Sequence, residues 1–364
     1  MTRFALAAAV TLSLMLAGSA GAADLKLKAG NPGVKSAGAL AFGPDGVLFI
    51  GDAQSAAVFA IATGEPSSGK GKAVNVKGIN SKIAALLGTT ARDILINDVA
   101  VNPATGTVYL SVSRGRGPKA MPAIVRVKSD GKLSQLSLKK ARFAKAELPN
   151  APAAGGTGRR NRRAQVITDL HYLDGKLIIA GLSNEEFASK LRVIPFPFAD
   201  PGKGASIEIF HGAHGRFETR SPVRTFVPFN IGGKPHILAA YTCTPLVKFP
   251  VADLVDGKKI KGTTIAELGN RNRPYDIIVY KKDGKDYLLM ANSARGVMKI
   301  STENIEKIKG ITKRVGGGGK AGLPYETIEN LKGVIQLDKL NDKQAVILVR
   351  GESGSLNLKT IDLP

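Results

Sequence analysis

The sequence has little of several residue types that build cofactor sites. Its 364 residues include one cysteine, Cys243, no tryptophan and four histidines, and aromatic residues make up 5% of the chain. A single thiol excludes an intrachain disulfide, a cysteine-rich zinc site, an iron–sulfur cluster and covalent haem attachment.

Acidic residues are scarce as well. The chain has 29 Asp and Glu against 52 Lys and Arg, which gives a formal net charge of +23. Such an excess serves solubility or attracts an anionic partner. A hydrophobic fraction of 43% in a chain of this length is sufficient for a large core and argues against disorder.

The first residues differ in kind from the rest. Arg3 precedes an apolar run over 4–17, and small residues follow as far as Ala23. This pattern is typical of a secretory signal peptide, and the run is too short to span a membrane. We expect cleavage of 1–23, and one domain over 24–364 that is monomeric, does not span a membrane and is periplasmic or secreted.

Helical periodicity is nearly absent from the remainder, apart from some helical spacing at Ile79 to Leu87. Short β-branched runs separated by Gly, Asp-Gly and Asn-Pro turns predict an all-β protein. Aligning the runs on their turns reveals six copies of one pattern. The first strands of the copies are expected at 39–42, 98–101, 169–173, 223–226, 276–279 and 333–337. We predict a six-bladed β-propeller, with two stacked β-sandwiches as the alternative fold.

Two further predictions concern how the ring closes and where the chain contains an inserted loop. Residues 24–28 alternate like a strand, whereas the sixth copy ends after three strands. We expect this N-terminal strand to complete the last blade and so to pair both exposed edges. A basic stretch at about 139–166, with four arginines between Arg159 and Arg163, is predicted to be a loop insertion.

The first copy contains the segment Phe42 to Asp52, FGPDGVLFIGD. It resembles the six-bladed propellers of NHL-repeat proteins and of senescence-marker-protein-like gluconolactonases. The resemblance is at the level of the fold. For the lactonases it implies a divalent metal held by a Glu of the first blade with Asn and Asp of other blades, but the first copy here has no Glu in strand or turn.

Antiparallel order within each blade predicts which residues share a face of the ring. The turns after the first and third strands carry Gly and Lys, whereas the opposite face, built from second turns and blade connections, is rich in arginine. Because guanidinium groups pair well with carboxylate and phosphate, we predict that this arginine-rich face binds an anionic small molecule, a polysaccharide or an acidic protein. Its candidate ligand-binding residues are Arg114, Arg216, Arg271, Arg273 and Arg295. No aromatic residues alternate with the Arg159–Arg163 cluster, so specific nucleic-acid binding is not expected.

Two sets of residues are candidate metal ligands on the same face. His171, His214 and Cys243, with His211 nearby in sequence, form a possible site for copper or zinc. Asp98, Asp169 and Asp276 begin inner strands, where carboxylates around the channel could bind Ca²⁺. The alternatives are ordinary hydrogen-bonded histidines with a buried cysteine, and aspartates that bond nearby backbone N–H groups.

These features leave three functions open. The first is an exported propeller that binds an anionic ligand without catalysis. The second is a metal-dependent, lactonase-like hydrolase that uses the aspartates and Arg273. The third is copper or quinone redox chemistry at His171, His214 and Cys243. The sequence contains no Ser-His-Asp order, no Gly-rich phosphate loop and no Gly-x-Ser-x-Gly motif.

Overall fold

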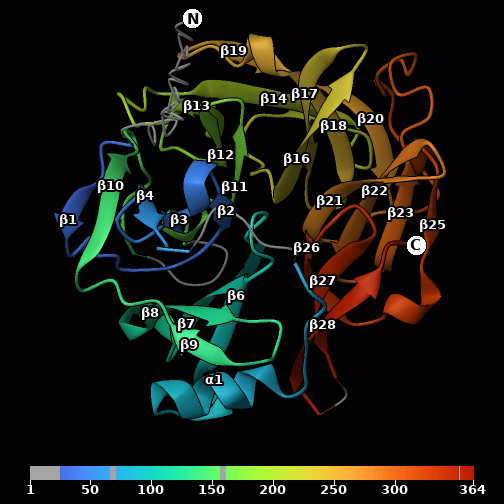
Figure 1. Cartoon of the computed structure of the whole chain (residues 1–364). Helices are drawn as coiled ribbons and strands as arrows, with labels where there is room; N and C mark the ends of the chain where they lie inside the picture. Colours follow the sequence, from blue (N-terminus) through green and yellow to red (C-terminus); the bar gives the residue numbers. More distant parts are fainter. Residues whose placement is uncertain (1–24, 66–70, 156–160, 352) are drawn as a thin grey trace, which may run out of the picture.

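The computed structural model describes residues 25–65, 71–155, 161–351 and 353–364. Their strands form six mostly antiparallel sheets, and each sheet has one edge strand toward the middle of the molecule (Figure 1). This arrangement confirms the predicted six-bladed β-propeller. The predicted signal peptide, 1–23, lies outside the described residues. Among the described helices, none combines the length and the apolar character that a membrane crossing requires.

Blades are numbered here by their order in the sequence, and the strands of each are given from the inside outward. Blade 1 consists of β2 (Leu40–Phe42), β3 (Val47–Asp52), β4 (Ala57–Ala62), β10 (Ala141–Glu147) and, at the edge, β1 (Lys28–Gly30). Blade 2 consists of β6 (Ile94–Val101), β7 (Val108–Arg114), β8 (Met121–Val127) and β9 (Leu133–Gln135). Blade 3 consists of β11 (Asp169–Leu173), β12 (Lys176–Leu182), β13 (Ser189–Pro195) and β14 (Ala205–His211), with β15 (Arg216–Glu218) and β19 (Lys259–Lys261) paired to β14.

The other three blades follow the same pattern. Blade 4 consists of β16 (Thr225–Ile231), β17 (Lys234–Ala240), β18 (Pro245–Pro250), β20 (Thr263–Leu268) and β24 (Lys320–Gly322). Blade 5 consists of β21 (Pro274–Lys282), β22 (Lys285–Asn292), β23 (Gly296–Ser301) and β25 (Tyr325–Thr327). Blade 6 consists of β26 (Val334–Lys339), β27 (Gln344–Arg350), β28 (Leu356–Asp362) and β5 (Asn75–Val76).

Helical structure is limited to one α-helix and short turns in the described residues. Helix α1 (Ile79–Leu87) coincides with the predicted helical segment, and it ends at Gly88, whose φ of 63° provides the left-handed C-cap. The 3₁₀ turns are η1 (Pro44–Gly46), η2 (Ala91–Asp93), η3 (Gly117–Lys119), η5 (Arg163–Gln165), η6 (Val251–Asp253) and η7 (Glu329–Leu331).

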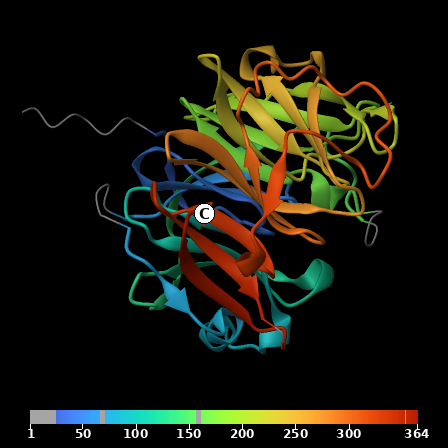
Figure 2. The ribbon, with the colours of Figure 1, turned by 90° about the vertical axis from the view of Figure 1, so that its right-hand side faces the viewer.

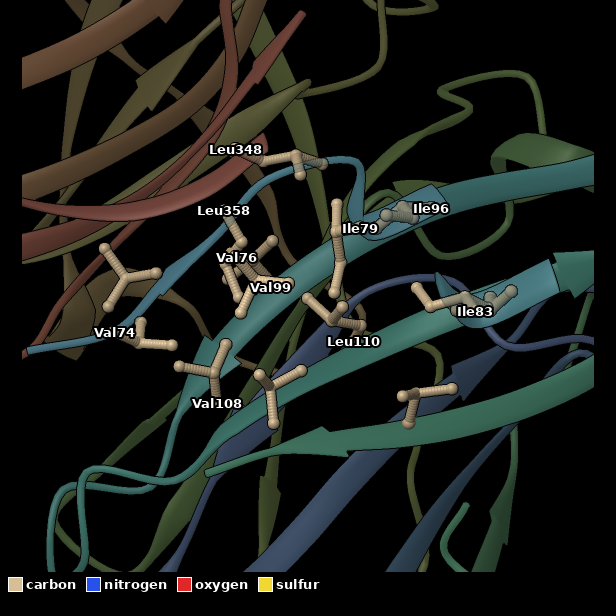
Figure 3. Close-up of a cluster of buried hydrophobic side chains, with 14 of the residues drawn as sticks. Val74, Val76, Ile79, Ile83, Ile96, Val99, Val108, Leu110, Leu348 and Leu358 are labelled. Atoms are coloured by element: carbon tan, nitrogen blue, oxygen red, sulfur yellow. The ribbon is translucent and has the colours of Figure 1, made fainter. Parts of the chain in front are cut away.

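The predicted closure of the last blade by residues 24–28 is wrong. The free edge of β28 is occupied by β5, with Leu358 paired to Val76, whereas β1 pairs with β10 in blade 1. The physical reason is burial. Val74 and Val76 are 2% and 3% exposed in the core of blades 2 and 6, which Figure 3 shows with Leu348 and Leu358 beside them. A segment that follows β4 in the chain therefore closes the ring.

The predicted loop at 139–166 is also only partly a loop. Its first residues form β10, the outer strand of blade 1. Farther along, the Arg163 guanidinium donates to the Pro152 carbonyl and the Arg162 guanidinium to the Ser183 carbonyl. Arg162 therefore fastens this stretch to blade 3, and Arg163 joins two parts of the stretch to each other. Residues 156–160 of the stretch lie outside the described ranges.

Exchange of outer strands accompanies a change in blade order around the ring. Inner strand β2 lies between β6 and β11, and β6 lies beside β26. Both views place the red strands of blade 6 next to the teal strands of blade 2 (Figures 1 and 2). The order around the ring is therefore 2, 1, 3, 4, 5, 6, with blades 1 and 2 exchanged relative to the sequence.

Four aspartates fasten neighbouring inner strands to one another. In each, one carboxylate oxygen accepts the backbone N–H of the following residue, and the other accepts an N–H from the next blade. The links between blades are Leu40 N–H to Asp98 (2.7 Å), Phe226 N–H to Asp169 (2.7 Å), Leu337 N–H to Asp276 (3.0 Å) and Val101 N–H to Asp338 (2.7 Å). We call these four residues the aspartate latches. Asp98 of blade 2 bonds blade 1 rather than blade 3, in agreement with the exchanged order.

The latches predict a specific loss of stability. Replacing Asp276→Ala leaves the N–H groups of Ile277 and Leu337 without their acceptor, which should lower the free energy of unfolding by about 2 kcal/mol. Denaturant unfolding at neutral pH measures this loss. Asp253→Ala makes the same substitution in an exposed turn and should change stability by less than about 0.5 kcal/mol. Equal losses in the two variants would contradict the latch.

Candidate metal centre

Three side chains that can bind a transition metal meet on the arginine-rich face, at the joint of blades 3 and 4. His211 ends β14, and His214 lies in the turn that leads to β15. Cys243 lies in the turn between β17 and β18 of the next blade. One ligand atom from each residue lies within 4.8 Å of those of the other two. Residues from two blades, well separated in the sequence, thus form one compact group.

The local backbone explains how these side chains are positioned. The N–H groups of His214 and Gly215 donate to the His211 carbonyl, and Gly215 has a φ of 70°, so the turn folds the second histidine back over the first. The imidazole centroids are 3.8 Å apart. Cys243 has a φ of 63°, and its N–H donates to the Asn272 carbonyl at 2.7 Å. This bond fixes the strained turn that presents the thiol.

Glu218 orients both imidazole rings. Its carboxylate oxygens lie 3.0 Å from Nδ1 of His211 and 2.6 Å from Nδ1 of His214. Although burial opposes its ionisation, hydrogen bonds from His211, Ser221 and His214 hold the pKa of Glu218 well below its usual range. Since the carboxylate accepts from each Nδ1–H, each Nε2 carries the free lone pair. Carboxylate support of this kind is typical of metal-binding histidines.

One of these lone pairs is buried without a partner. His211 is 2% exposed, and its Nε2 has no hydrogen-bond partner among the described residues. A buried nitrogen left unpaired costs free energy, which a metal bond would recover. His214 and Cys243 are more accessible, with 43% of the His214 side chain exposed. The group therefore has a buried side, held by protein, and a side open to solvent.

A second carboxylate lies behind the turn. Glu267 of β20 is 1% exposed; its Oε1 accepts the N–H of Gly212, and its Oε2 has no partner among the described residues. A Cβ on Gly212 would lie 2.9 Å from that Oε1, so glycine is required for this close approach. Burial raises the pKa of Glu267 to about 7, opposed by the N–H bonds of Gly212 and Ala213. Neither Glu218 nor Glu267 was among the predicted site residues. The spacing of Glu218, four residues after His214, was the available signal.

The predicted metal ligands thus separate into different places. His214 and Cys243 come together with His211, whereas His171 lies in the central channel, where burial lowers its pKa to about 4. Asp98, Asp169 and Asp276 are aspartate latches. Within the described ranges, these carboxylates form no group with ligand atoms within 4.8 Å of one another. The alternative, hydrogen bonding to nearby backbone N–H groups, accounts for their hydrogen bonds apart from one that Oδ1 of Asp98 accepts from Nε2 of Gln336.

The five predicted arginines also have different surroundings. Arg114 donates to the Gly88 carbonyl, Arg295 donates to the Asn270 carbonyl, and Arg216 pairs with Glu218 at 3.5 Å. Arg271 and Arg273 are exposed and flank Asn272, the residue that holds Cys243. Neither forms an ion pair in the part of the chain that the structure describes. Four of the five therefore lie in or beside the segments around the metal centre, and Arg114 belongs to blade 2.

The central channel contains a cavity of about 840 Å³. Its lining runs from the aspartate latches to the turns after the inner strands, including Gly71, Pro103 and Asn341. It therefore extends toward the lysine-rich face, away from the metal centre, and no predicted arginine lines it. Its polar groups are mainly carboxyls that already accept backbone N–H groups. The lining of the channel therefore serves to hold the inner strands together.

Comparison with known proteins adds no family. The sequence matches no family model and no curated protein. Among solved structures, a putative oxidoreductase (glucose dehydrogenase) from Thermus thermophilus is 14% identical, with 92% of this chain and 100% of that chain covered and a TM-score of 0.36. A PQQ-bound aldose sugar dehydrogenase from Streptomyces coelicolor is 10% identical, with 92% and 97% covered and a TM-score of 0.32. An engineered GH43 glycoside hydrolase is 10% identical, with 75% and 51% covered and a TM-score of 0.36. These values are too low to transfer an activity.

The channel carboxyls predict a pH dependence of stability. Burial, with Asp169 nearby, raises the pKa of Asp98 to about 8, and burial raises that of Asp169 to about 7 and that of Asp338 to about 6. An acid with a higher pKa in the fold than in the unfolded chain stabilises the fold fully below pH of about 4 and loses that contribution as the pH rises through the folded pKa.

The free energy of unfolding should therefore fall between pH 6.5 and 8, by up to about 1.4 kcal/mol per pH unit for each proton that the fold retains and the unfolded chain has lost. His171, whose pKa in the fold is about 4, opposes this decrease mainly at the lower end of the range, where the imidazole of the unfolded chain titrates. Urea unfolding at several pH values tests this. Asp98→Asn cannot ionise and should show a smaller decrease over the same range. A variant whose decrease equals that of the native protein would contradict the assignment to Asp98.

Proposed function

We propose that this propeller is a metalloprotein that holds a zinc or copper ion at His211, His214 and Cys243 and takes an anionic ligand on its arginine-rich face. The observation that carries the proposal is His211, whose buried Nε2 has no hydrogen-bond partner among the described residues. One ring nitrogen of His211 lies within 4.8 Å of a ligand atom of a second imidazole and of the only thiol of the chain. Two imidazoles and a thiolate are the donors that zinc and copper prefer, and they do not suit Ca²⁺.

The residues have distinct roles in this proposal. His211 and His214 would bind through Nε2 and Cys243 through Sγ, while Glu218 holds both rings in the required tautomer. Three protein ligands leave a further position for water or an external ligand, as in catalytic zinc sites. A bound zinc ion would supply Lewis acidity there, and a bound copper ion would supply one-electron chemistry.

The same geometry distinguishes between the other functions predicted from the sequence. Lactonase-like hydrolysis at Asp98, Asp169 and Asp276 is not supported, because these carboxylates hold the inner strands together. Hydrolysis or redox chemistry at His211, His214 and Cys243 remains compatible with the donor set. Anion binding is supported by Arg271 and Arg273, which are exposed beside Cys243. Export of the mature chain is part of the proposal and rests on the sequence of residues 1–23.

Metal binding is the first test. Protein purified without a polyhistidine tag and dialysed against Zn²⁺ or Cu²⁺ should retain one ion per chain by elemental analysis. The retained metal should raise the melting temperature by a few degrees, since a ligand at 100 times its Kd stabilises by about 2.7 kcal/mol. Cys243→Ser and His211→Ala should lose the ion, whereas His236→Ala, whose ring bonds the Lys234 carbonyl elsewhere, should keep it. Equal retention by all four proteins would contradict the site.

The supporting role of Glu218 gives a second test. Glu218→Gln keeps the size of the side chain but removes the charge that both imidazoles share, so metal affinity should fall roughly 10- to 100-fold. Competition with a chelator of known affinity measures the change. Glu208→Gln, in β14 on the same blade, is the matched control and should leave the affinity unchanged. A Glu218→Gln variant with native affinity would show that the carboxylate does not orient the ligands.

A further inference from the structure

Arg224 lies beside the proposed metal centre although its sequence position marks it only as part of an inner strand. Its Nε donates to Oγ1 of Thr242 at 3.1 Å, and Thr242 precedes Cys243 in the same turn. Its backbone N–H donates to the Ala240 carbonyl, and two residues later the Phe226 N–H is held by Asp169. The position of the Arg224 guanidinium is therefore set by blade 4 and by an aspartate latch.

Arg273 is connected to the same turn through its neighbour Asn272. The Asn272 carbonyl accepts the Cys243 N–H, and the next residue, Arg273, is fixed through its backbone N–H to Oγ of Ser293 and through its carbonyl to the Ser293 N–H. Two arginines thus come from segments that are hydrogen-bonded to the turn that carries the thiol. One comes from blade 4, and the other comes from the connection between blades 4 and 5.

The two charges are close and not neutralised. Burial and, to a smaller extent, the nearby positive charge of Arg273 lower the pKa of Arg224 to about 10. Neither guanidinium pairs with a carboxylate in the described ranges. Two like charges held together by the backbone, beside a cation site, are a cost to the free protein that a bound anion would remove.

We infer that Arg224 and Arg273 form a clamp for an oxyanion, a phosphate or carboxylate group, and that one oxygen of this group occupies the open position of the proposed metal ion. The inference rests on the proposed function, because the clamp acts together with the metal. The planar, forked guanidinium matches the oxygens of either group, whereas a neutral or cationic ligand would leave both charges uncompensated. Arg224 is then a specificity-determining residue, since it is partly buried and its Nε is hydrogen-bonded to the turn.

The test uses the full chain loaded with Co²⁺, whose visible spectrum responds to a change of metal ligand. Metal content is measured first in every protein, and each is then titrated with inorganic phosphate and, separately, with acetate. The native protein should show a saturable spectral change with at least one of them. Arg224→Ala/Arg273→Ala should keep one Co²⁺ per chain but bind that anion roughly 100-fold more weakly, as expected when two charge-assisted hydrogen bonds are lost.

The matched control, Lys132→Ala/Lys176→Ala, removes the same two charges from exposed positions on the lysine-rich face and should bind the anion like the native protein. If anion affinity fell equally in the two double variants, the effect would come from net charge alone, and this result would overturn the clamp. A metal-loaded native protein whose spectrum responds to neither anion would also overturn it, with the metal centre intact. A native chain that retains no Co²⁺ would instead overturn the proposed function, and with it the clamp.

Discussion

The ring depends on one repeated interaction, a carboxylate shared between two inner strands. Each aspartate latch satisfies the N–H of its own following residue and an N–H of the next blade, so it holds together strands of different sheets that do not pair with each other. The latches all point the same way around the ring. Asp98 leads from blade 2 to blade 1 and Asp338 from blade 6 to blade 2, which is possible only with blades 1 and 2 exchanged. At the corresponding position, blade 1 has Ala39 and blade 4 has Thr225, and the joints that follow these blades lack a latch within the described residues.

Local periodicity was sufficient to predict the six blades and α1, because the alternation of strands and the turn residues are encoded within each copy. The order of the blades was not predictable in the same way. Val74–Val76 and Leu25–Leu27 are equally good short strand signals, and only burial against Leu358 decides which one closes blade 6. Outer strands contribute few residues to pairing, so their assignment is decided by the packing between blades, which a single sequence does not display.

The candidate site shows the same limit. Rare residue types predicted that His214 and Cys243 lie together, as they do in the structure, because both occur near blade ends on one face. His171 was grouped with them since it shares the region of the sequence, but its inner strand directs it into the channel. Glu218 offered only its spacing from His214 as a signal, and Arg224 carried none. Their roles arise from a hairpin that folds back on itself and from a turn of the neighbouring blade, which are contacts across blades.

The candidate metal centre also affects how neighbouring blades of the ring are connected. The joint of blades 3 and 4 has a latch, Asp169 to Phe226, and the hairpin that carries His211 and His214 reaches across it to Cys243. The joint of blades 4 and 5 lacks one among the described residues, and there the Cys243 N–H bonds the Asn272 carbonyl instead, with the Asn272 side chain bonded to Asn292 of blade 5. An ion at Cys243 would therefore connect blade 3 to the turn that fastens blade 4 to blade 5. The site can assemble only after these blades have docked, so binding energy at the metal would act directly on the closure of the ring.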